Sequence, residues 1–268
     1  MDLVGILILA VVQGLTEFLP ISSDGHLVVV SALYQQATGR TMEGEQLTLT
    51  IVLHAGTLLA VLVVFRRQIL RLATSDRRVV PLLIVGTLPV GVIGMALKIW
   101  CKPLLESPTA AGVGLIITGV LLRWMHRFEQ ADDTERREYR DLGYGETLVI
   151  GLFQAVAALP GVSRSGSTIA SGLGLCGLKR ADAANFSFLL SIPAVGGAVF
   201  LELVDLVRKG SSQSFVPTDL AIGAVVSFVV GLFALNWLLR WLQAGRLHLF
   251  AWWCIPLGIG VTIWQLAK

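Results

Sequence analysis

LPISSDGH occupies residues 19–26, and a similar string, LPGVSRSGST, occupies residues 159–168. Each string interrupts an apolar stretch at a Leu-Pro pair and gathers hydroxyl groups, a glycine and ionisable side chains. Such groups are costly at membrane depth and usually serve a function there, and non-helical backbone at that depth must be satisfied by protein or by a watery cavity. Two matching interruptions, one in each half of the chain, predict a site where two structural repeats meet.

The composition is typical of a polytopic membrane protein. Of 268 residues, 54% are hydrophobic and 15% are charged, whereas soluble domains carry about 25% charged residues. The net charge of +3 is too small to indicate nucleic-acid binding, and the start lacks the basic region of a cleavable signal peptide. Three cysteines, Cys101, Cys176 and Cys254, lie far apart without metal-ligand spacing and are expected to fill apolar space.

Six apolar segments approach the length of about 20 residues that a membrane span needs. They are Leu47–Phe65, Val79–Ile99, Ala110–Leu122, Phe186–Val207, Leu220–Leu239 and Leu249–Leu266, of which the third is short and is expected to extend at one end. The polar strings do not fit simple spans. Leu3–Leu19 with Leu27–Leu33, and Thr147–Leu159 with Ile169–Leu178, each predict a helix-break-helix hairpin that enters and leaves the membrane on one side.

This layout predicts an all-α membrane protein with a single membrane domain, residues 1–268. Residues 1–125 and 146–268 each hold one re-entrant helical hairpin and three transmembrane helices, and residues 126–145 form a charged, solvated cytoplasmic connector. Because three spans are an odd number, the second half is inverted relative to the first, and the hairpin tips approach from opposite faces. An ordinary eight-span protein is the alternative, and it does not require the polar breaks to meet.

The basic residues predict the orientation, because Lys and Arg are commoner in cytoplasmic loops. Most of them lie on one side of this layout, in residues 66–78, 123–140, 179–180 and 240–246. We therefore expect both termini outside the cytoplasm.

The second string has the composition of a phosphate-binding site. It opens a predicted helix, and successive backbone N–H groups at a helix N-terminus bind anions. Arg164 adds a forked, permanently charged donor suited to phosphate. The alternative is a helix cap with an arginine that reaches the membrane interface. The string is not a Walker A loop, because no Lys follows a Gly at the required place.

The first string and the helix before it supply acid–base and nucleophilic groups. His26 is a candidate base or acid, and Ser22 and Ser23 are candidate nucleophiles or phosphate ligands. Glu17 lies four residues after Gln13 on an apolar helix, where a buried carboxylate needs a partner, a proton or a metal. A protonated Glu17 within the bundle is the alternative. Opposite an arginine string, these groups predict phosphoryl transfer.

Other polar residues give weaker signals. His54 either faces the cavity or donates to a backbone carbonyl, and Asn185 and Ser187 are as consistent with contacts between helices as with a site. His126 and His248 lie at loop edges and are expected to be solvated. The tryptophans of the last two spans are expected to face the lipid and its interface.

The chain resembles a known family at three segments. Residues 13–26, QGLTEFLPISSDGH, resemble the first signature of bacterial undecaprenyl-diphosphate phosphatases of the bacitracin-resistance type. Residues 160–168 resemble the second signature, and residues 184–193, ANFSFLLSIP, also look like a family segment. Length and span layout match as well, so the resemblance covers essentially the whole chain.

The resemblance implies hydrolysis of a lipid diphosphate, undecaprenyl diphosphate, at a site open to the outer side of the bacterial cytoplasmic (inner) membrane. It implies Glu17, Ser23, His26 and Arg164 as catalytic residues. Expected substrate contacts come from Ser22, Gly25, Ser163, Ser165, Gly166 and Thr168. A divalent cation, Mg²⁺ or Ca²⁺, is implied, with Glu17 and Asp24 as candidate ligands, and a homodimer is left open.

Two positions depart from the family pattern. Gln13 stands where Glu or Gln is usual, and Asp24 stands where Thr is common. Asp caps a helix about as well as Thr, but its charge repels a diphosphate unless a cation or Arg164 neutralises it.

We therefore expect a membrane phosphatase in which residues 163–168 hold the phosphates and Ser23 attacks with His26 as base. Glu17 orients His26 or holds a cation, and attack by water, with Ser23 as a ligand, stays open. The rival is a transporter or flippase of a polyprenyl phosphate, because paired hairpins in inverted repeats are typical of transporters. A scaffold without chemistry leaves Arg164 and His26 unexplained.

Overall fold

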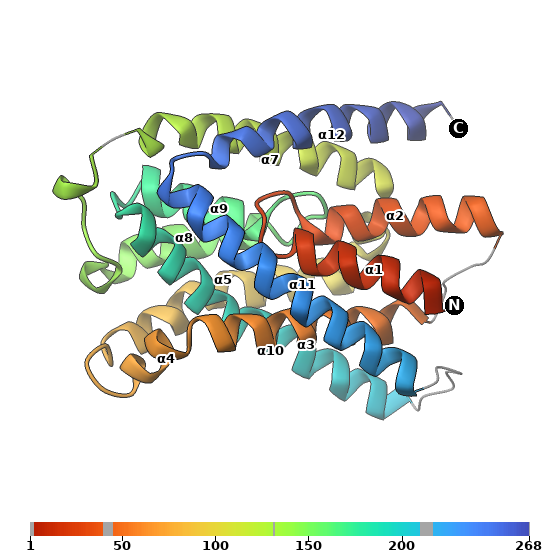
Figure 1. Cartoon of the computed structure of the whole chain (residues 1–268), viewed down its shortest axis with the longest axis horizontal. Helices are drawn as coiled ribbons and strands as arrows, with labels where there is room; N and C mark the ends of the chain where they lie inside the picture. Colours follow the sequence, from red (N-terminus) through yellow and green to blue (C-terminus); the bar gives the residue numbers. More distant parts are fainter. Residues whose placement is uncertain (1–2, 40–44, 131, 210–216, 268) are drawn as a thin grey trace.

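The computed structural model describes residues 3–39, 45–130, 132–209 and 217–267, and helices dominate all four stretches (Figure 1). Most of the helices run along the long axis of the molecule. Their bounds are α1 Leu3–Thr16, α2 Ser23–Thr38, α3 Glu45–Val64, α4 Arg66–Leu72, α5 Val79–Trp100, α6 Lys102–Leu105, α7 Pro108–Glu129, α8 Tyr144–Val156, α9 Arg164–Gly174, α10 Arg180–Lys209, α11 Pro217–Gln243 and α12 Ala251–Leu266. Three single 3-10 turns, η1 Asp133–Glu135, η2 Tyr139–Asp141 and η3 Leu247–Phe250, lie in the links.

Six helices, α3, α5, α7, α10, α11 and α12, match the six predicted spans. Of these, α5, α7, α10 and α11 are long and apolar enough by themselves to cross a membrane, and α12 is so together with η3. α3 passes the same test together with α4, from which it is bent by 75°. The third span extends at both ends rather than at one, because α7 starts at Pro108 and continues to Glu129. The prediction of an all-α polytopic membrane protein is confirmed at this level.

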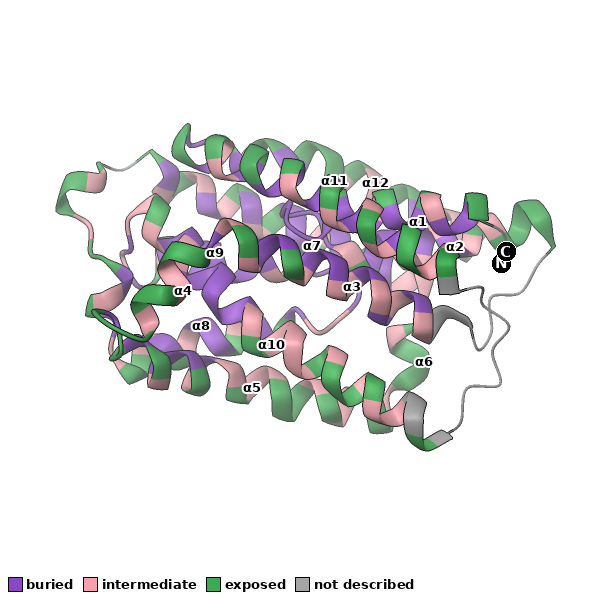
Figure 2. Ribbon diagram, turned by 60° about the horizontal axis from the view of Figure 1, so that its bottom comes forward, coloured by how far each residue is buried: buried purple, intermediate pink, exposed green. Residues whose placement is uncertain are grey.

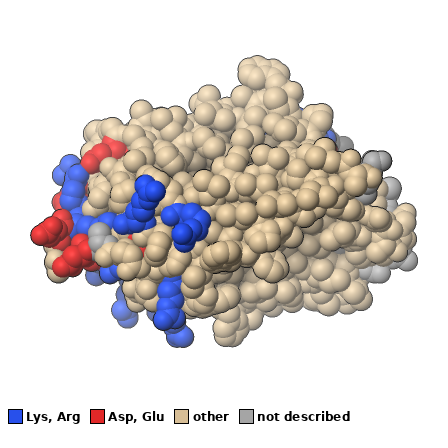
Figure 3. Space-filling model, turned by 90° about the horizontal axis from the view of Figure 1, so that it is seen from above, with Lys and Arg blue, Asp and Glu red and all other residues tan. Residues whose placement is uncertain are grey.

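The outer surface between the two ends of the bundle is apolar. Large side chains stand exposed along α5, α11 and α12, among them Val92, Phe233 and Trp252, the last with 74% of its surface accessible. Figure 2 shows exposed positions on the outward faces of the helices and buried positions toward the middle. In Figure 3 most of the visible charged side chains gather at one end, and the middle of that face is uncharged. This distribution suits a lipid-facing belt.

Both polar strings connect a pair of contacting helices, as the hairpin prediction requires. α1 packs against α2, and α8 packs against α9. α2 is longer than the two turns expected from its apolar residues, because Gln35 and Gln36 continue the helix to Gly39. Gly39 ends it with φ +67°, a conformation that glycine adopts without strain.

Close helix contacts form where glycines face each other. A side chain on Gly151 of α8 would meet the carbonyl oxygen of Gly86 in α5, and one on Gly258 of α12 would meet that of Gly112 in α7, at 2.5 and 2.6 Å. Small residues let helix backbones approach within a membrane, where dispersion contacts rather than water exclusion hold helices together. These contacts fix how α8 and α12 lie against the first half of the chain.

The connector between the halves is docked onto the bundle and is less solvated than expected. Arg136 donates to the carbonyl oxygens of Leu173, Leu178 and Phe128 at 2.7–3.3 Å. The hydroxyl of Tyr139, which is 3% exposed, donates to Asp76 at 2.9 Å. Burial and this hydrogen bond raise the pKa of Tyr139. Arg136 and Tyr139 therefore anchor the connector to the helix ends.

Candidate active site

The tips of the two hairpins touch. A side chain on Gly25, in the first string, would lie 2.7 Å from Cα of Gly161 in the second. Gly161 has φ +85°, and a side chain there would collide with the carbonyl oxygen of Ala111 in α7. Thr118 of α7 holds the second tip in place: its hydroxyl donates to the Gly161 carbonyl at 2.7 Å and accepts from the Ser163 amide at 2.9 Å. Gly25 and Gly161, 136 positions apart in the chain, are thereby brought into one site.

Ser22 shapes the first tip. It has φ +68°, the only positive φ of a residue other than glycine in the described stretches, and such a conformation costs of order 1–3 kcal/mol. Its hydroxyl caps α2 by accepting from the Gly25 amide at 3.3 Å, and its carbonyl accepts from the His26 amide at 3.2 Å. The turn lets α2 begin at Ser23, directly beside the end of α1.

Glu17 is the centre of the site. One carboxylate oxygen, Oε1, accepts from Nη2 of Arg164 at 2.5 Å. The other, Oε2, accepts from the Ser23 hydroxyl at 2.7 Å and from the Gln13 amide at 3.0 Å. The Glu17 side chain is 5% exposed and that of Arg164 is 21% exposed. The carboxylate thus joins the nucleophile candidate of the first string to the cation of the second.

His54 of α3 joins this group, although its sequence signal was ambiguous. Its Nδ1 lies 2.9 Å from the Thr50 carbonyl oxygen and therefore donates. Its Nε2 faces two carboxylates, at 3.7 Å from Glu17 Oε2 and 3.9 Å from Asp24 Oδ1. The imidazole thus lies between the buried carboxylate and Asp24, whose side chain is 60% exposed.

A cavity of about 240 Å³ lies over these groups, and aliphatic side chains of α5 and α10, among them Val90 and Val195, complete its lining. Its lining includes Glu17, Ser22, Ser23, Asp24, His54, Ser163, Arg164 and Glu202 of α10. A second cavity of about 270 Å³ adjoins it, since Asp24, Thr50 and Ala158 line both. The rest of the second lining is mostly apolar, from α1, α2 and α3 and from Leu105 and Pro160. The chamber that holds the ionisable groups therefore continues into a cavity lined mainly by aliphatic side chains.

His26 lies apart from this chamber. Its Nδ1 is 2.8 Å from the Ser22 carbonyl oxygen, and its Nε2 accepts from the indole N–H of Trp253 at 2.9 Å. The two rings are nearly parallel, with centroids 6.3 Å apart. Ser23 donates to Glu17, so the expected hydrogen bond between Ser23 and His26 is not formed in the structure as described. Glu17, and not the expected base His26, is therefore the hydrogen-bond partner of the Ser23 hydroxyl.

The second string reaches the chamber with only part of its length. Ser163 and Arg164 line it, and the Ser163 hydroxyl caps α9 by accepting from the Gly166 amide at 3.1 Å and lies 3.2 Å from the Ser165 hydroxyl. Thr168 turns away: its hydroxyl lies 2.6 Å from that of Ser187 in α10. Ser187 thus has the helix-joining role that was one of its two interpretations.

The three glycines of the strings, Gly25, Gly161 and Gly166, let the two tips approach each other closely. Gly25 packs on Gly161, and a side chain on Gly166 would meet Pro20 of the first tip at 3.3 Å. Ser165, Gly166 and Thr168 are not among the described residues that line the chamber. Of the expected substrate contacts, Ser22 and Ser163 line the chamber, whereas the other four lie behind it among the packed helices.

Two residues that help to build the site had no usable signal in the sequence. Thr118 stands in an apolar helix. Trp253 fits the pattern of a lipid-facing tryptophan and is 55% exposed, yet its indole N–H also donates to His26. Only the positions of the tips beside α7 and α12 give these side chains their partners. His54 and Glu202 are polar groups in apolar helices, which is a signal in itself.

The sequence of this chain is similar to those of known proteins over nearly its whole length. The family model for the bacitracin resistance protein BacA matches residues 6–260. A protein of Rhodopirellula baltica named undecaprenyl-diphosphatase is 49% identical over 265 residues, which are 99% of both chains. Proteins of the same name from Desulfatibacillum aliphaticivorans and Korarchaeum cryptofilum are 42% and 37% identical over at least 96% of each chain. Such identity across the whole length confirms the resemblance carried by the two polar strings, and this chain belongs to the family of the bacitracin resistance protein BacA.

Proposed function

We propose that this protein hydrolyses undecaprenyl diphosphate to undecaprenyl phosphate and inorganic phosphate, and so recycles the lipid carrier of cell-wall synthesis. The observation that carries the proposal is the buried Glu17 carboxylate, which holds the Ser23 hydroxyl and the Arg164 guanidinium in one chamber. Relatives that match nearly the whole chain are named for this activity. No comparable observation favours the transporter alternative.

The geometry supports a two-step displacement. Ser23 Oγ transfers its proton to Glu17 Oε2, with which it already shares a hydrogen bond, and attacks the terminal phosphorus. The bridging P–O bond breaks, and undecaprenyl phosphate leaves. Water then attacks the phosphoserine, and the proton held by Glu17 returns to Ser23 as inorganic phosphate departs.

Arg164 stabilises the charge that develops on the phosphorus oxygens. One of its N–H groups holds Glu17, and a guanidinium has four more donors in a planar fork. Because Arg164 lines the chamber and is the first residue of α9, the positive end of that helix acts in the same direction. Charge stabilisation of this kind is usually the largest catalytic term.

The two cavities fit the two parts of the substrate. The chamber that holds Arg164 and Ser23 accepts the diphosphate, and the adjoining apolar cavity accepts the first part of the prenyl chain. Burial of apolar chain contributes about 25 cal/mol per Å². A lipid diphosphate is thereby preferred over a water-soluble one.

Asp24 is the group that fits a divalent cation. Its carboxylate is partly open to the chamber, whereas the Glu17 oxygens are already engaged by Arg164, Ser23 and Gln13. Mg²⁺ is often bound by one or two carboxylates and substrate phosphates. When bound, such an ion would neutralise charge on the diphosphate. We assign the binding of this ion to Asp24 rather than to Glu17.

Asp24→Thr is expected to weaken the dependence of activity on Mg²⁺ or Ca²⁺ while folding stays nearly intact, because Thr also caps helices. Titration of both ions against the wild type and the variant measures this. Superimposable curves would show that Asp24 does not bind the cation and serves only as a helix cap.

The membrane arrangement that we propose is an inverted repeat, with α1–α2 and α8–α9 as re-entrant hairpins from opposite faces. The halves are residues 1–125 and 146–268. Its support is the pairing of equivalent helices: α1 packs on α11 as α8 packs on α5, and α7 packs on α12. The Arg-rich connector lies in the cytoplasm, and the site opens to the outer side of the inner membrane.

Cysteine labelling tests this orientation. Glu106 and Glu135 are exposed at opposite ends of α7 and its connector. After replacement of the three native cysteines, Glu106→Cys should react in intact cells with a membrane-impermeant thiol reagent, and Glu135→Cys should react only after lysis. The reverse pattern would place the site opening in the cytoplasm.

Phosphate release by the purified protein tests the function itself. In detergent micelles with Mg²⁺ or Ca²⁺, the wild type should release phosphate from a prenyl diphosphate, although no second compartment exists. Ser23→Ala should lose this activity, whereas the control Ser171→Ala, which removes a buried hydroxyl of α9 outside the chamber, should keep it. Binding without release would favour the transporter, and an active Ser23→Ala would assign the attack to water.

A further inference from the structure

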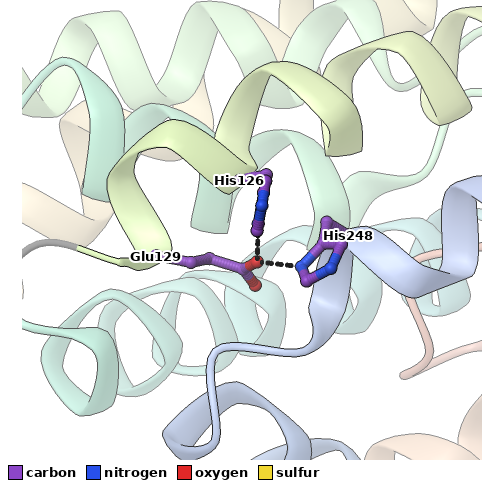
Figure 4. A group of neighbouring side chains, drawn as sticks. All are labelled: His126, Glu129 and His248. Carbon is purple, nitrogen blue, oxygen red and sulfur yellow. Dashed lines mark hydrogen bonds and ion pairs between the residues drawn. The ribbon is translucent and has the colours of Figure 1, made fainter.

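A second cluster of ligand-type side chains lies far from the chamber in the sequence and in the fold. His126 and Glu129 come from the last turns of α7, and His248 comes from η3, just before α12 (Figure 4). One ligand atom from each lies within 4.8 Å of the others. Glu129 Oε2 is 2.7 Å from His248 Nδ1 and 3.6 Å from His126 Nδ1. None of the three lines the catalytic chamber.

Hydrogen bonding explains only part of this cluster. Glu129, which is fully buried, accepts from the Leu247 amide at 2.8 Å and from His248. These bonds account for a carboxylate that caps the turn before α12. They do not account for His126, whose Nδ1 is buried and has no hydrogen-bond partner among the described residues. The two imidazole rings nevertheless lie only 3.8 Å apart between centroids.

We propose that His126, Glu129 and His248 bind a zinc ion through the two Nδ1 atoms and Oε2. Ligands held 2.0–2.1 Å from a tetrahedral zinc lie about 3.3 Å from one another, and the two separations above bracket that value. Two imidazoles with one carboxylate suit Zn²⁺ and not Mg²⁺ or Ca²⁺, which take oxygen ligands. The His126 and His248 side chains are 33% and 16% exposed, so water completes the coordination.

The ion ties the end of α7 to the start of α12. α7 and α12 pack along each other, and the cluster lies where α7 ends and α12 is about to begin. A zinc ion there replaces the unmet hydrogen bond of His126 by a metal bond and holds the α12 start against α7. It therefore acts on stability, independently of the phosphatase chemistry, because binding to the folded state alone raises the free energy of unfolding.

Zinc binding by the purified full-length protein tests the proposal. After chelation and dialysis, zinc is titrated into the wild type, His126→Phe and the control Glu135→Gln, which removes an exposed carboxylate of the adjacent connector. Phe keeps a ring beside His248 but cannot bind metal. We expect His126→Phe to bind one zinc ion fewer per chain, or to bind it at least tenfold more weakly, and Glu135→Gln to behave as the wild type.

Thermal unfolding separates a metal site from a structural cluster. Zinc should raise the Tm of the wild type and of Glu135→Gln but not of His126→Phe, and the metal-free Tm of His126→Phe should stay near that of the wild type, because its Nδ1 loses no hydrogen bond. Cobalt substitution should produce the visible absorption of a tetrahedral site in the wild type only. Equal zinc binding by His126→Phe and the wild type, or no zinc binding by either, would overturn the proposal.

The outcome is independent of the proposed phosphatase function. His126→Phe should release phosphate at the wild-type rate, since the cluster does not line the chamber. His248→Gln is a second variant, in which zinc binding should also be lost. If His248→Gln fails to fold because the hydrogen bond between residue 248 and Glu129 is lost, the zinc binding of His126→Phe still tests the proposal.

Discussion

Glu17→Gln is expected to lower kcat/KM for prenyl-diphosphate hydrolysis by about 100- to 10,000-fold, the range of a lost general base. The amide keeps the shape of the side chain, but it cannot take the Ser23 proton. It also leaves Arg164 without its counter-charge in a site where the carboxylate is 5% exposed. Steady-state phosphate release at saturating and limiting substrate measures the loss, which should fall mainly on kcat.

Stability needs a separate control in this variant. Removing one partner of a buried ion pair costs about 3–5 kcal/mol, so Glu17→Gln should unfold at a lower temperature. Glu17→Asp keeps the charge and the pair with Arg164 but withdraws the carboxylate from Ser23 by one methylene group. It should be more stable than Glu17→Gln and still be strongly impaired. A Glu17→Gln protein with at least a tenth of wild-type turnover would remove Glu17 from the reaction.

Arg164→Lys is expected to lower kcat by at least about 100-fold, as the loss of one transition-state donor does in other enzymes. Lysine keeps the positive charge, but its ammonium is a single point and cannot hold Glu17 and span a phosphate at once. The effect should appear in kcat more than in KM, because the charge on the phosphorus oxygens is greatest in the transition state.

Arg137→Lys is the matched control for this change. Arg137 pairs with Glu146 at the exposed end of the molecule, where an ion pair contributes at most about 1 kcal/mol. Its activity should match the wild type, and both variants should unfold at similar temperatures. Near-normal turnover of Arg164→Lys would make Arg164 a structural anchor, and the phosphates would then need other donors.

The spans and the location of the site were predictable because each depends on local composition. An apolar run of about 20 residues has few alternatives to a membrane helix, and α5, α10, α11 and α12 lie where the runs predict them. The ends were less predictable: α7 continues beyond its apolar residues to Glu129, and α2 continues to Thr38. Intrahelical hydrogen bonds extend a helix wherever no breaker intervenes, whether or not its side chains are apolar.

The partners of the site residues were not predictable, because they depend on how each helix is rotated and which helix lies beside it. Ser23 and His26 are three residues apart on α2, yet Ser23 meets Glu17 and His26 meets Trp253, 227 positions away. His54 became part of the site only when α3 placed it beside Asp24. His126 and His248 were expected in solvent, and they meet around Glu129.

By itself, the sequence determined that this protein is helical and membrane-embedded and that its chemistry lies in two polar strings, since apolar runs, Leu-Pro breaks and an arginine among hydroxyls have their meaning in the local chain. Only the tertiary structure decided that Glu17 rather than His26 holds Ser23 and that Thr168 faces α10. The physical reason is that burial demands a partner for every polar group, and close packing of the helices decides which partner is within reach.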